Sequence, residues 1–302
     1  MGWFQRRRKN QAVPDAQRQR GFGLGWLRGR RRLAEVPYLL PSDFAEGNRL
    51  DMQHYLLKVA YGGHNFTAPI QTPLGVLDVG CGTGRWAREM ALQFPQTNVV
   101  GIDIKEPEID TAAKQLADLG SLPENYAFVQ GNVLAGLPFA DGNFDYTHMR
   151  FLSLALPMTS WQPLVQDIAR VTRRGGWVEI LEFNIPNGGG PAFTKIQEYW
   201  RQLAAKFGMH PGAGSQVENY MRGANLANVN TRFIRLDTAD RSRTARMAAV
   251  DLYTGLASSG PAMIAAGIVP KEEFDRLYAQ VRDDITRFNT TWDLYAVVGQ
   301  HV

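Results

Sequence analysis

Short apolar runs alternate with amphipathic segments along residues 75 to 183. The most apolar runs predict five strands, at residues 75–80, 98–104, 126–131, 144–149 and 176–183. The segments between them predict three helices, which are residues 84–95, a stretch near 109–119, and one with Trp161, Leu164, Val165 and Ile168 on a single face. Strands that alternate with helices at this spacing form βαβ units. The sequence therefore predicts an α/β fold with a parallel sheet.

Further elements flank this alternating core on both sides. Before it, Asp43 can cap a helix that ends at Gly62 and Gly63. After it, the pattern predicts a helix at 191–207, a strand near 229–236, helical segments within 242–287 and a last strand at 291–300. We expect one domain over residues 37–302, in which the segments at about 37–65 and 190–290 form a helical cap.

The N-terminal residues differ from the rest of the chain in charge. Residues 1–32 contain ten Lys and Arg and one acidic residue, so their formal net charge is +9. Because the whole chain carries +4, the remainder carries −5. We expect residues 1–36 to form a basic, disordered tail, whose residues 1–32 would make weak contact with anionic surfaces. The mildly acidic remainder does not indicate a polyanion-binding surface.

Composition excludes several other classes of protein. Cys81 is the only cysteine, which excludes a disulfide framework, and no spacing of Cys and His predicts a zinc site. Glu179 and Glu182 resemble a metal-binding pair, but their spacing puts them on opposite faces of a strand, so we expect no metal. The chain has no signal-peptide pattern and no apolar run long enough to span a membrane. We therefore expect a cytoplasmic protein; its oligomeric state stays open.

Three glycines at alternate positions follow the first predicted strand, in the segment VLDVGCGTGRW at residues 76–86. Glycine is unfavourable inside strands and helices, so we expect a ligand to approach this backbone closely. Ligands of open α/β sheets bind beyond the carboxyl ends of the strands, where the following helix offers free N–H groups. Asp103 ends the second strand and can accept hydrogen bonds from both hydroxyls of a ribose. The segment therefore predicts a nucleoside-containing cofactor.

The spacing of the glycines separates two classes of cofactor. The dinucleotide pattern G-x-G-x-x-G/A needs a small residue at position 85, which is Arg85. The chain instead has D-x-G-x-G-x-G, followed in order by VVGIDI, GNV, PFADGNFDYTHMR and RRGGWVEILEF. This series resembles the class I S-adenosylmethionine-dependent methyltransferases. The segments YLLPSDFAEGNRLDMQHYLL and GGWVEILE are similar, more narrowly, to the LaeA-like methyltransferases, first known as regulators of fungal secondary metabolism.

The resemblance implies a Rossmann-like sheet of seven strands, mostly parallel, with an antiparallel last strand and helices on both faces. It also implies that S-adenosyl-L-methionine is the cofactor. Gly80, Cys81 and Gly82 would pass under its methionine and ribose parts, and Gly84 completes the motif. Asp78 would orient the amino group of the methionine part.

The remaining cofactor contacts implied by the resemblance come from the next strands. Asp103 would hold the ribose diol, and Ile104 and Val133 would enclose the adenine. Many relatives have Asp where this chain has Asn132, whose amide oxygen can still accept a hydrogen bond from the adenine amine. Met149 would lie near the methionine portion.

Two histidines are candidates for a general base, which is needed only if the acceptor stays protonated. His148 ends the fourth predicted strand, where the fold brings cofactor and acceptor together, and His54 lies on the helix expected to cover the site. We prefer His148 on position. The alternative for each is a structural or cofactor-orienting histidine, and we expect Cys81 to be a packing residue rather than a nucleophile.

The methyl acceptor is defined less well by the sequence. The chain lacks an N-P-P-Y-type motif and a Pro-Cys nucleophile, which nucleic-acid methyltransferases use. An aromatic-rich insert suits a compact, largely apolar small molecule and contains Trp200, Phe207, Tyr220, Phe233 and Tyr253. We therefore predict O-, N- or S-methylation of a small molecule, which would suit specialised metabolism. The alternatives are a protein methyltransferase, a regulatory partner that docks through the tail, or cofactor-dependent chemistry other than methyl transfer.

Overall fold

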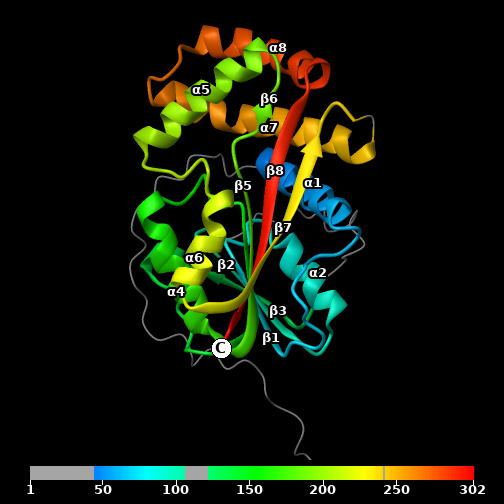
Figure 1. Ribbon diagram of the computed structural model, residues 1–302, viewed down its shortest axis with the longest axis vertical. Coiled ribbons are helices and arrows are strands. Elements are labelled where there is room, and N and C mark those ends of the chain that lie inside the picture. Colours follow the sequence, from blue (N-terminus) through cyan, green and yellow to red (C-terminus); the bar gives the residue numbers. More distant parts are fainter. Residues whose placement is uncertain (1–43, 106–121, 241) are drawn as a thin grey trace, which may run out of the picture.

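A computed structural model describes residues 44–105, 122–240 and 242–302, and Figure 1 shows the arrangement of their elements. The predicted basic tail, the cap at Asp43 and the predicted helix near 109–119 lie outside these residues.

One sheet forms the centre of the molecule. Its strands are β1 (Gly75–Val79), β2 (Asn98–Asp103), β3 (Tyr126–Gln130), β4 (Phe144–Arg150), β5 (Thr172–Phe183), β6 (Asn187–Gly188), β7 (Leu226–Asp237) and β8 (Thr290–His301). They lie in the order β3-β2-β1-β4-β5-β8-β6, and β7 pairs with β8. Strands β1 to β5 are parallel, and β8 runs antiparallel to β5, β6 and β7. The predicted fold class is confirmed.

The strand count differs from the prediction. The two residues of β6 pair with Thr290 and Thr291 of β8, so the sheet of the described residues has eight strands rather than seven. A strand of two residues leaves no hydrophobic periodicity in the sequence, and the pattern could not reveal it.

Helices cover both faces of the sheet and form the cap. They are α1 (Phe44–Ala60), α2 (Arg85–Gln93), α4 (Trp161–Val171), α5 (Pro191–Lys206), α6 (Val217–Gly223), α7 (Arg243–Ala265) and α8 (Lys271–Arg287). One apolar core lies between the sheet and α4 and α6, and another packs α2 against the opposite face. The predicted apolar face of α4 is buried. Within the described residues, no helix combines the length and apolar character needed to cross a membrane.

Three long strands carry the cap. β5, β7 and β8 have 12 residues each, whereas β1 has five. At ~3.3 Å per residue, a 12-residue strand extends about 40 Å and outreaches the short parallel strands. The C-terminal ends of β5 and β7 and the N-terminal end of β8 pack against α5, α7 and α8 in a separate apolar core. This core lies at the top of Figure 1.

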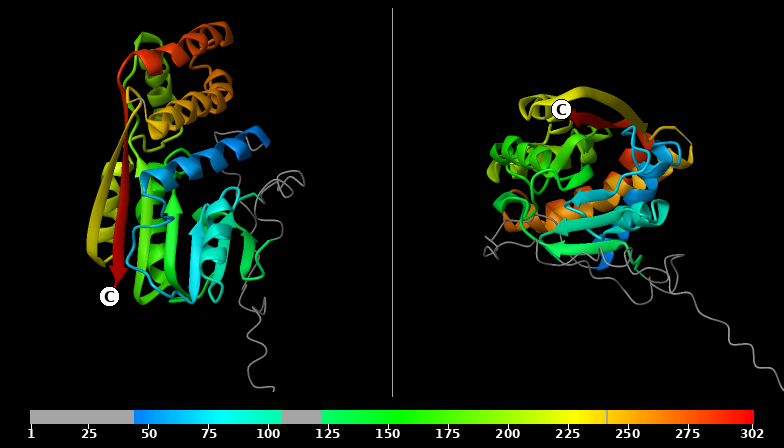
Figure 2. Two further views of the ribbon diagram at one scale, coloured as in Figure 1. Left: turned by 90° about the vertical axis from the view of Figure 1, so that its right-hand side faces the viewer. Right: turned by 90° about the horizontal axis from the view of Figure 1, so that it is seen from below.

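Helix α1 lies between the cap and the carboxyl ends of the parallel strands, as the left view of Figure 2 shows. Leu56, Leu57 and Tyr61, at and just beyond its C-terminal end, belong to the core of the cap. A Cβ on Gly82 would lie 3.5 Å from Leu50, so the other side of α1 approaches the glycine segment. The first helix thus contacts both halves of the molecule.

Candidate functional site

The glycine segment forms the turn between β1 and α2. Gly80, Gly82 and Gly84 have φ values of 68°, 54° and 70°, which L-residues rarely adopt. A Cβ on Gly80 would lie 2.7 Å from Leu152, and one on Gly84 would lie 2.6 Å from the Tyr126 hydroxyl. At these two positions the close approach is made by the protein's own side chains. A Cβ on Gly82 would meet no atom of residues 44–105, 122–240 and 242–302 closer than 3.5 Å, so a ligand could approach the backbone there.

Asp103 lies beside Gly82 at the end of β2. Its Oδ2 accepts a hydrogen bond from the Gly82 N–H at 2.9 Å, and its Oδ1 accepts a longer one from the Lys105 N–H at 3.3 Å. Burial raises the pKa of Asp103, although these backbone N–H groups favour its charged form. A carboxylate has about four lone-pair directions, so Asp103 can still accept two hydroxyl donors. The free acceptor positions of Asp103 fit the two ribose hydroxyls of S-adenosylmethionine.

Neighbouring strand ends bring further predicted cofactor residues to the same edge of the sheet. Ile104 follows β2 and Val133 follows β3, and both are half-buried. The Asn132 side chain accepts a hydrogen bond from the Leu134 N–H at 2.9 Å and thereby caps a short 3-10 helix at Val133–Ala135. An amide oxygen has two lone pairs, so Asn132 retains one for a ligand.

Other predicted cofactor residues point into the protein. Met149 is fully buried in the core beside α4. The Cys81 sulfur packs against Gly101, where an added Cβ would lie 2.8 Å from it, and burial raises the pKa of the Cys81 thiol. The structure therefore gives the side chains of both residues to packing, and only the backbone of Cys81 is left to face a ligand.

His148 lies inside the layer between the sheet and α2. Its Nδ1 donates to the Asp78 Oδ1 at 2.9 Å, and its ring stacks on Trp86 with centroids 3.8 Å apart and planes 9° apart. His148 and Asp78 are each 2% exposed. The pairing of Asp78 with His148 across β1 and β4 was not foreseen, and it uses one oxygen of the carboxylate that was expected to orient the cofactor.

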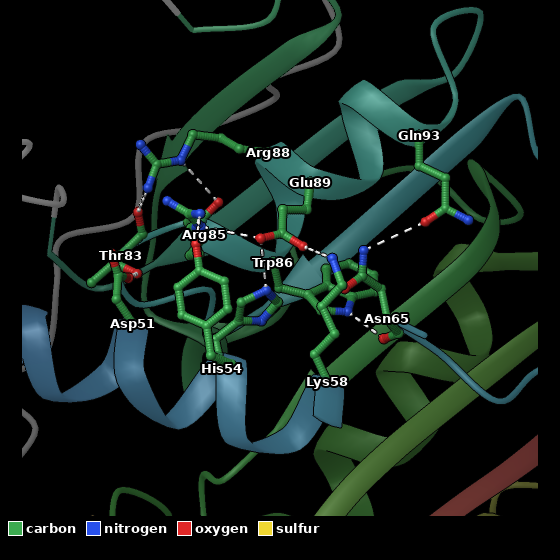
Figure 3. A network of polar contacts seen from close by, with 12 residues as sticks. Asp51, His54, Lys58, Asn65, Thr83, Arg85, Trp86, Arg88, Glu89 and Gln93 are labelled. Atoms are coloured by element: carbon green, nitrogen blue, oxygen red, sulfur yellow. Dashed lines mark hydrogen bonds and ion pairs between the residues drawn. The ribbon is translucent and has the colours of Figure 1, made fainter. Parts of the chain in front are cut away.

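His54 belongs to a polar network that joins α1 to α2, shown in Figure 3. Its Nδ1 lies 3.1 Å from the guanidinium of Arg150, which can only donate, so Nδ1 is the acceptor and Nε2 carries the proton. Nε2 lies 3.1 Å from Glu89. Burial lowers the pKa of His54. Burial would raise the pKa of Glu89, but His54 and Lys58 hold it well below its usual value.

The two histidines therefore lie together but away from open space. His54 and His148 line one void of ≈10 Å³, which can hold at most a single water. Neither belongs to the lining of the larger cavity described next. The general base stays a prediction for both residues, and the geometry favours the structural alternative.

A cavity of ≈130 Å³ lies between the cap and the carboxyl ends of β4 and β5. Its wall is mostly apolar and includes Leu50 of α1, Phe183 of β5, Leu256 of α7 and Trp292 of β8. Phe151, directly after β4, also lines it and has φ 54°. Positive φ is strained for a bulky residue and often marks a functional site.

One side of the cavity is polar. Arg49 donates to Asp251 at 3.0 Å and to Glu46 at 2.6 and 2.9 Å, and Gln53 donates to Asp251 at 2.9 Å. Burial would lower the pKa of Arg49, but the two carboxylates raise it above its usual value, so this guanidinium stays charged. This network joins α1 to α7, and Arg49, Gln53 and Asp251 all line the cavity.

The aromatic residues expected to form an acceptor site are dispersed. Trp200 lines the cavity. Tyr220 stacks on Trp161 and Tyr253 on Tyr278, with centroids 5.7 and 4.5 Å apart. The remaining two differ: Phe233 is 48% exposed on β7, and Phe207 packs against the core of the cap. The expectation holds for Trp200 alone, because aromatic content does not reveal which way a ring points.

Glu179 and Glu182 each bind backbone N–H groups on opposite sides of β5. Glu179 accepts hydrogen bonds from Thr67 and Ala68, and Glu182 accepts from Leu152. Both carboxylates are fully buried and hold loops in place. Among the described residues, no three His, Cys, Asp or Glu side chains form a potential metal cluster.

Comparison with known proteins identifies the class. A family model described as a methyltransferase domain matches residues 76–176, which run from β1 into β5 and include the glycine segment and Asp103. The chain contains a methyltransferase domain.

Relatives of this methyltransferase extend the match. The N-methyltransferase tcpN of Claviceps purpurea (strain 20.1) is 26% identical over 274 residues, which cover 85% of this chain and 94% of that protein. The secondary metabolism regulator laeA of Coprinopsis cinerea is 31% identical over 155 residues, which cover 49% of this chain and 36% of that protein. A solved structure of YcgJ from Bacillus subtilis covers 82% of this chain and 98% of its own, with a TM-score of 0.50 and 17% identity. This last likeness shows the fold.

Sequence reasoning missed the polar side of the cavity. The signal was available in part, because Glu46, Arg49 and Gln53 recur at helical spacing on one face of the first helix. A polar stripe of this kind would ordinarily face solvent, yet all three side chains are buried. Asp251, the partner of Arg49 and Gln53, lies about 200 positions further along the chain, and no local pattern connects it to them.

Proposed function

We propose that the methyltransferase transfers a methyl group to an oxygen, nitrogen or sulfur atom of a small, largely apolar molecule that binds in the cavity under the cap. One observation carries the proposal. A mainly apolar cavity lies beyond the carboxyl ends of β4 and β5, and Leu50 of α1 both lines it and lies 3.5 Å from the position of a Cβ on Gly82. Small-molecule sites have this composition, with few polar groups in an apolar wall.

The cofactor would lie along the ends of β1, β2 and β3. Gly82 would offer its backbone, Asp103 would accept the ribose hydroxyls, and Ile104 and Val133 would contact the adenine. Half-burial of these residues supports the assignment. Asn132 would add an amide oxygen for the adenine amine.

The residues around the cavity would act mainly by position. When bound, S-adenosylmethionine supplies a methyl group that is already activated by its sulfonium. The apolar wall would exclude water and hold the acceptor atom ~3–3.5 Å from that methyl group in line with it. Phe151, directly after β4, lines the cavity, and its ring lies beside those of Phe183 and Trp292.

A protein acceptor is the competing possibility, and it would engage the basic residues 1–32. The ≈130 Å³ size of the cavity favours a small molecule, because a peptide needs an open groove. Relatives described as N-methyltransferases and as a regulator of secondary metabolism are compatible with both possibilities.

A cavity-filling variant tests the proposal. Gly255 of α7 lines the cavity, and an added Cβ would lie 4.0 Å from its nearest neighbour, Arg49. Gly255→Leu should fill the space without strain and should favour the helix. We expect it to abolish methyl transfer in a screen of phenols, amines and thiols, while calorimetry shows unchanged S-adenosylhomocysteine binding.

A matched control and an alternative acceptor complete the experiment. Ala257→Leu places the same side chain on the exposed side of α7 and should leave transfer intact. Methylation of a protein that persists in Gly255→Leu but is lost on removal of residues 1–34 would contradict the proposal and support the protein acceptor.

A further inference from the structure

We propose that the acceptor presents an N–H or O–H group to the amide oxygens of Gln53 and Gln197. The inference rests on the proposed function and names the substrate class of the same cavity. Both glutamines line the cavity, Gln53 from α1 and Gln197 from α5. The two glutamines are 8% and 5% exposed, so both are buried polar residues in a mostly apolar wall.

The orientation of the Gln53 amide follows from its partner. Its Nε2 lies 2.9 Å from the Asp251 Oδ2, and a carboxylate can only accept a hydrogen bond. The Arg49 guanidinium donates to the other oxygen of Asp251 at 3.0 Å, so a positive charge lies beside this carboxylate. The amide nitrogen of Gln53 must therefore face Asp251, and its oxygen Oε1 faces away from it.

The orientation of the Gln197 amide is fixed by the same reasoning. Its Nε2 lies 2.7 Å from the backbone oxygen of Pro186, which also can only accept. Reversing the amide would bring two oxygens together at that distance. The Oε1 of Gln197 is therefore turned away from Pro186.

Neither amide oxygen has a partner in the part of the protein that the structure describes. Among the described residues, no donor bonds to the Oε1 of Gln53 or of Gln197. Neither oxygen is among the side-chain atoms that are completely buried without a hydrogen-bond partner. Each oxygen thus keeps access to open space while its residue lines the cavity. The rest of the wall is mostly apolar and offers these oxygens few hydrogen-bond donors. A ligand with an N–H or O–H group would therefore satisfy them.

This arrangement predicts which ligands the cavity rejects. A buried acceptor left without a donor loses its hydrogen bond to water and gains nothing in return. A site built to bind a polar hydrogen therefore discriminates strongly against an analogue that lacks one. Carboxylates and phosphates are disfavoured as well, because Asp251 and both amide oxygens would repel them, and Arg49 is already bound to two carboxylates.

Two isosteric probes test the inference. 5-Fluoroindole has an N–H group and 5-fluorobenzofuran has a ring oxygen in its place, and both can be followed by fluorine NMR with the full chain and saturating S-adenosylhomocysteine. We expect the indole to bind at least ~10-fold more tightly than the benzofuran. Gln197→Met and Gln53→Met keep a side chain of similar length without the amide, and we expect each to reduce that preference to less than about 3-fold.

Leu256→Val is the matched control, because it changes the shape of the same wall and no polar atom. It should weaken both probes alike and keep the preference. Equal binding of the two probes by the unaltered protein, or an unchanged preference in both glutamine variants, would overturn the inference. Binding of neither probe would also overturn it and would remove the cavity assignment, whereas retained S-adenosylhomocysteine binding would leave the methyltransferase assignment intact.

Discussion

The hydroxyl of Thr83 in the glycine segment donates a hydrogen bond to the carboxylate of Asp51 in α1, with 2.6 Å between Oγ1 and Oδ1. Figure 3 shows both side chains at the edge of the network that joins α1 to α2. Asp51 lies between Arg49 and Gln53 in the sequence, and both of these residues line the cavity under the cap. The bond therefore ties the proposed cofactor loop to the helix that forms one wall of the proposed acceptor site.

Thr83→Val tests this tie, because it removes the hydroxyl and preserves the shape of the side chain. We expect S-adenosylhomocysteine to bind ~3- to 10-fold more weakly, since a hydrogen bond to a charged group contributes roughly 1.5–3 kcal/mol and part of it will be replaced by water. Calorimetry measures the change. Thr254→Val is the control, because the Thr254 hydroxyl bonds only to carbonyls of its own helix. Equal affinity in the two variants would show that the bond does not order the loop.

Asp103→Ala should weaken S-adenosylhomocysteine binding by at least ~10-fold. Two ribose hydroxyls donating to a carboxylate form charge-assisted bonds, and the variant also loses the acceptor for the Gly82 N–H. Asp103→Asn retains one oxygen and should lose less. NAD should not bind the unaltered protein. An unchanged dissociation constant in Asp103→Ala would mean that the ribose lies elsewhere.

His148→Ala separates a structural role from a catalytic one. The ring is buried, stacks on Trp86 and donates to Asp78, so its removal leaves a void and an unpaired carboxylate. We expect a loss of unfolding free energy of about 2–4 kcal/mol in urea titrations. Turnover measured well below the melting temperature should fall less than ~10-fold. A general base would cost ~10²–10⁴ in turnover, with partial rescue at alkaline pH.

Glu182 predicts a pH dependence of stability. Burial raises its pKa to about 8, from an ordinary value of 4.5 in the unfolded chain. Between these values the folded state binds more protons than the unfolded state, so this group makes stability fall as pH rises. The lowered pKa of His54 acts in the opposite sense, but only below its unfolded value of 6.5. The contribution of Glu182 is therefore best measured from pH 6.5 to 8.

Glu182→Gln removes this titration and retains an oxygen for the Leu152 N–H. Urea unfolding should show a decline from pH 6.5 to 8 in the unaltered protein and a flatter profile in the variant. Parallel profiles would contradict a raised pKa for this group.

The alternation of strands and helices was predictable because it depends on local periodicity. The apolar face of α4, at Trp161, Leu164, Val165 and Ile168, was predicted from its spacing and is buried. The glycine spacing likewise identified the cofactor class, because a tight turn needs positive φ angles at closely spaced positions and glycine adopts them readily. Class, fold and cofactor were therefore contained in short stretches of sequence.

Only the tertiary structure decided where the cavity under the cap lies and which polar residues line it. Periodicity shows that a residue lies on one face of an element, but the element that packs against that face can come from anywhere in the chain. Arg49 meets Asp251 across 202 positions, and Gln53 and Gln197 reach one cavity from different helices. His148 lies near the carboxyl end of β4, as predicted, yet the packing of Trp86 over it enclosed the ring. Burial and partners follow from such long-range packing, which sequence patterns do not encode.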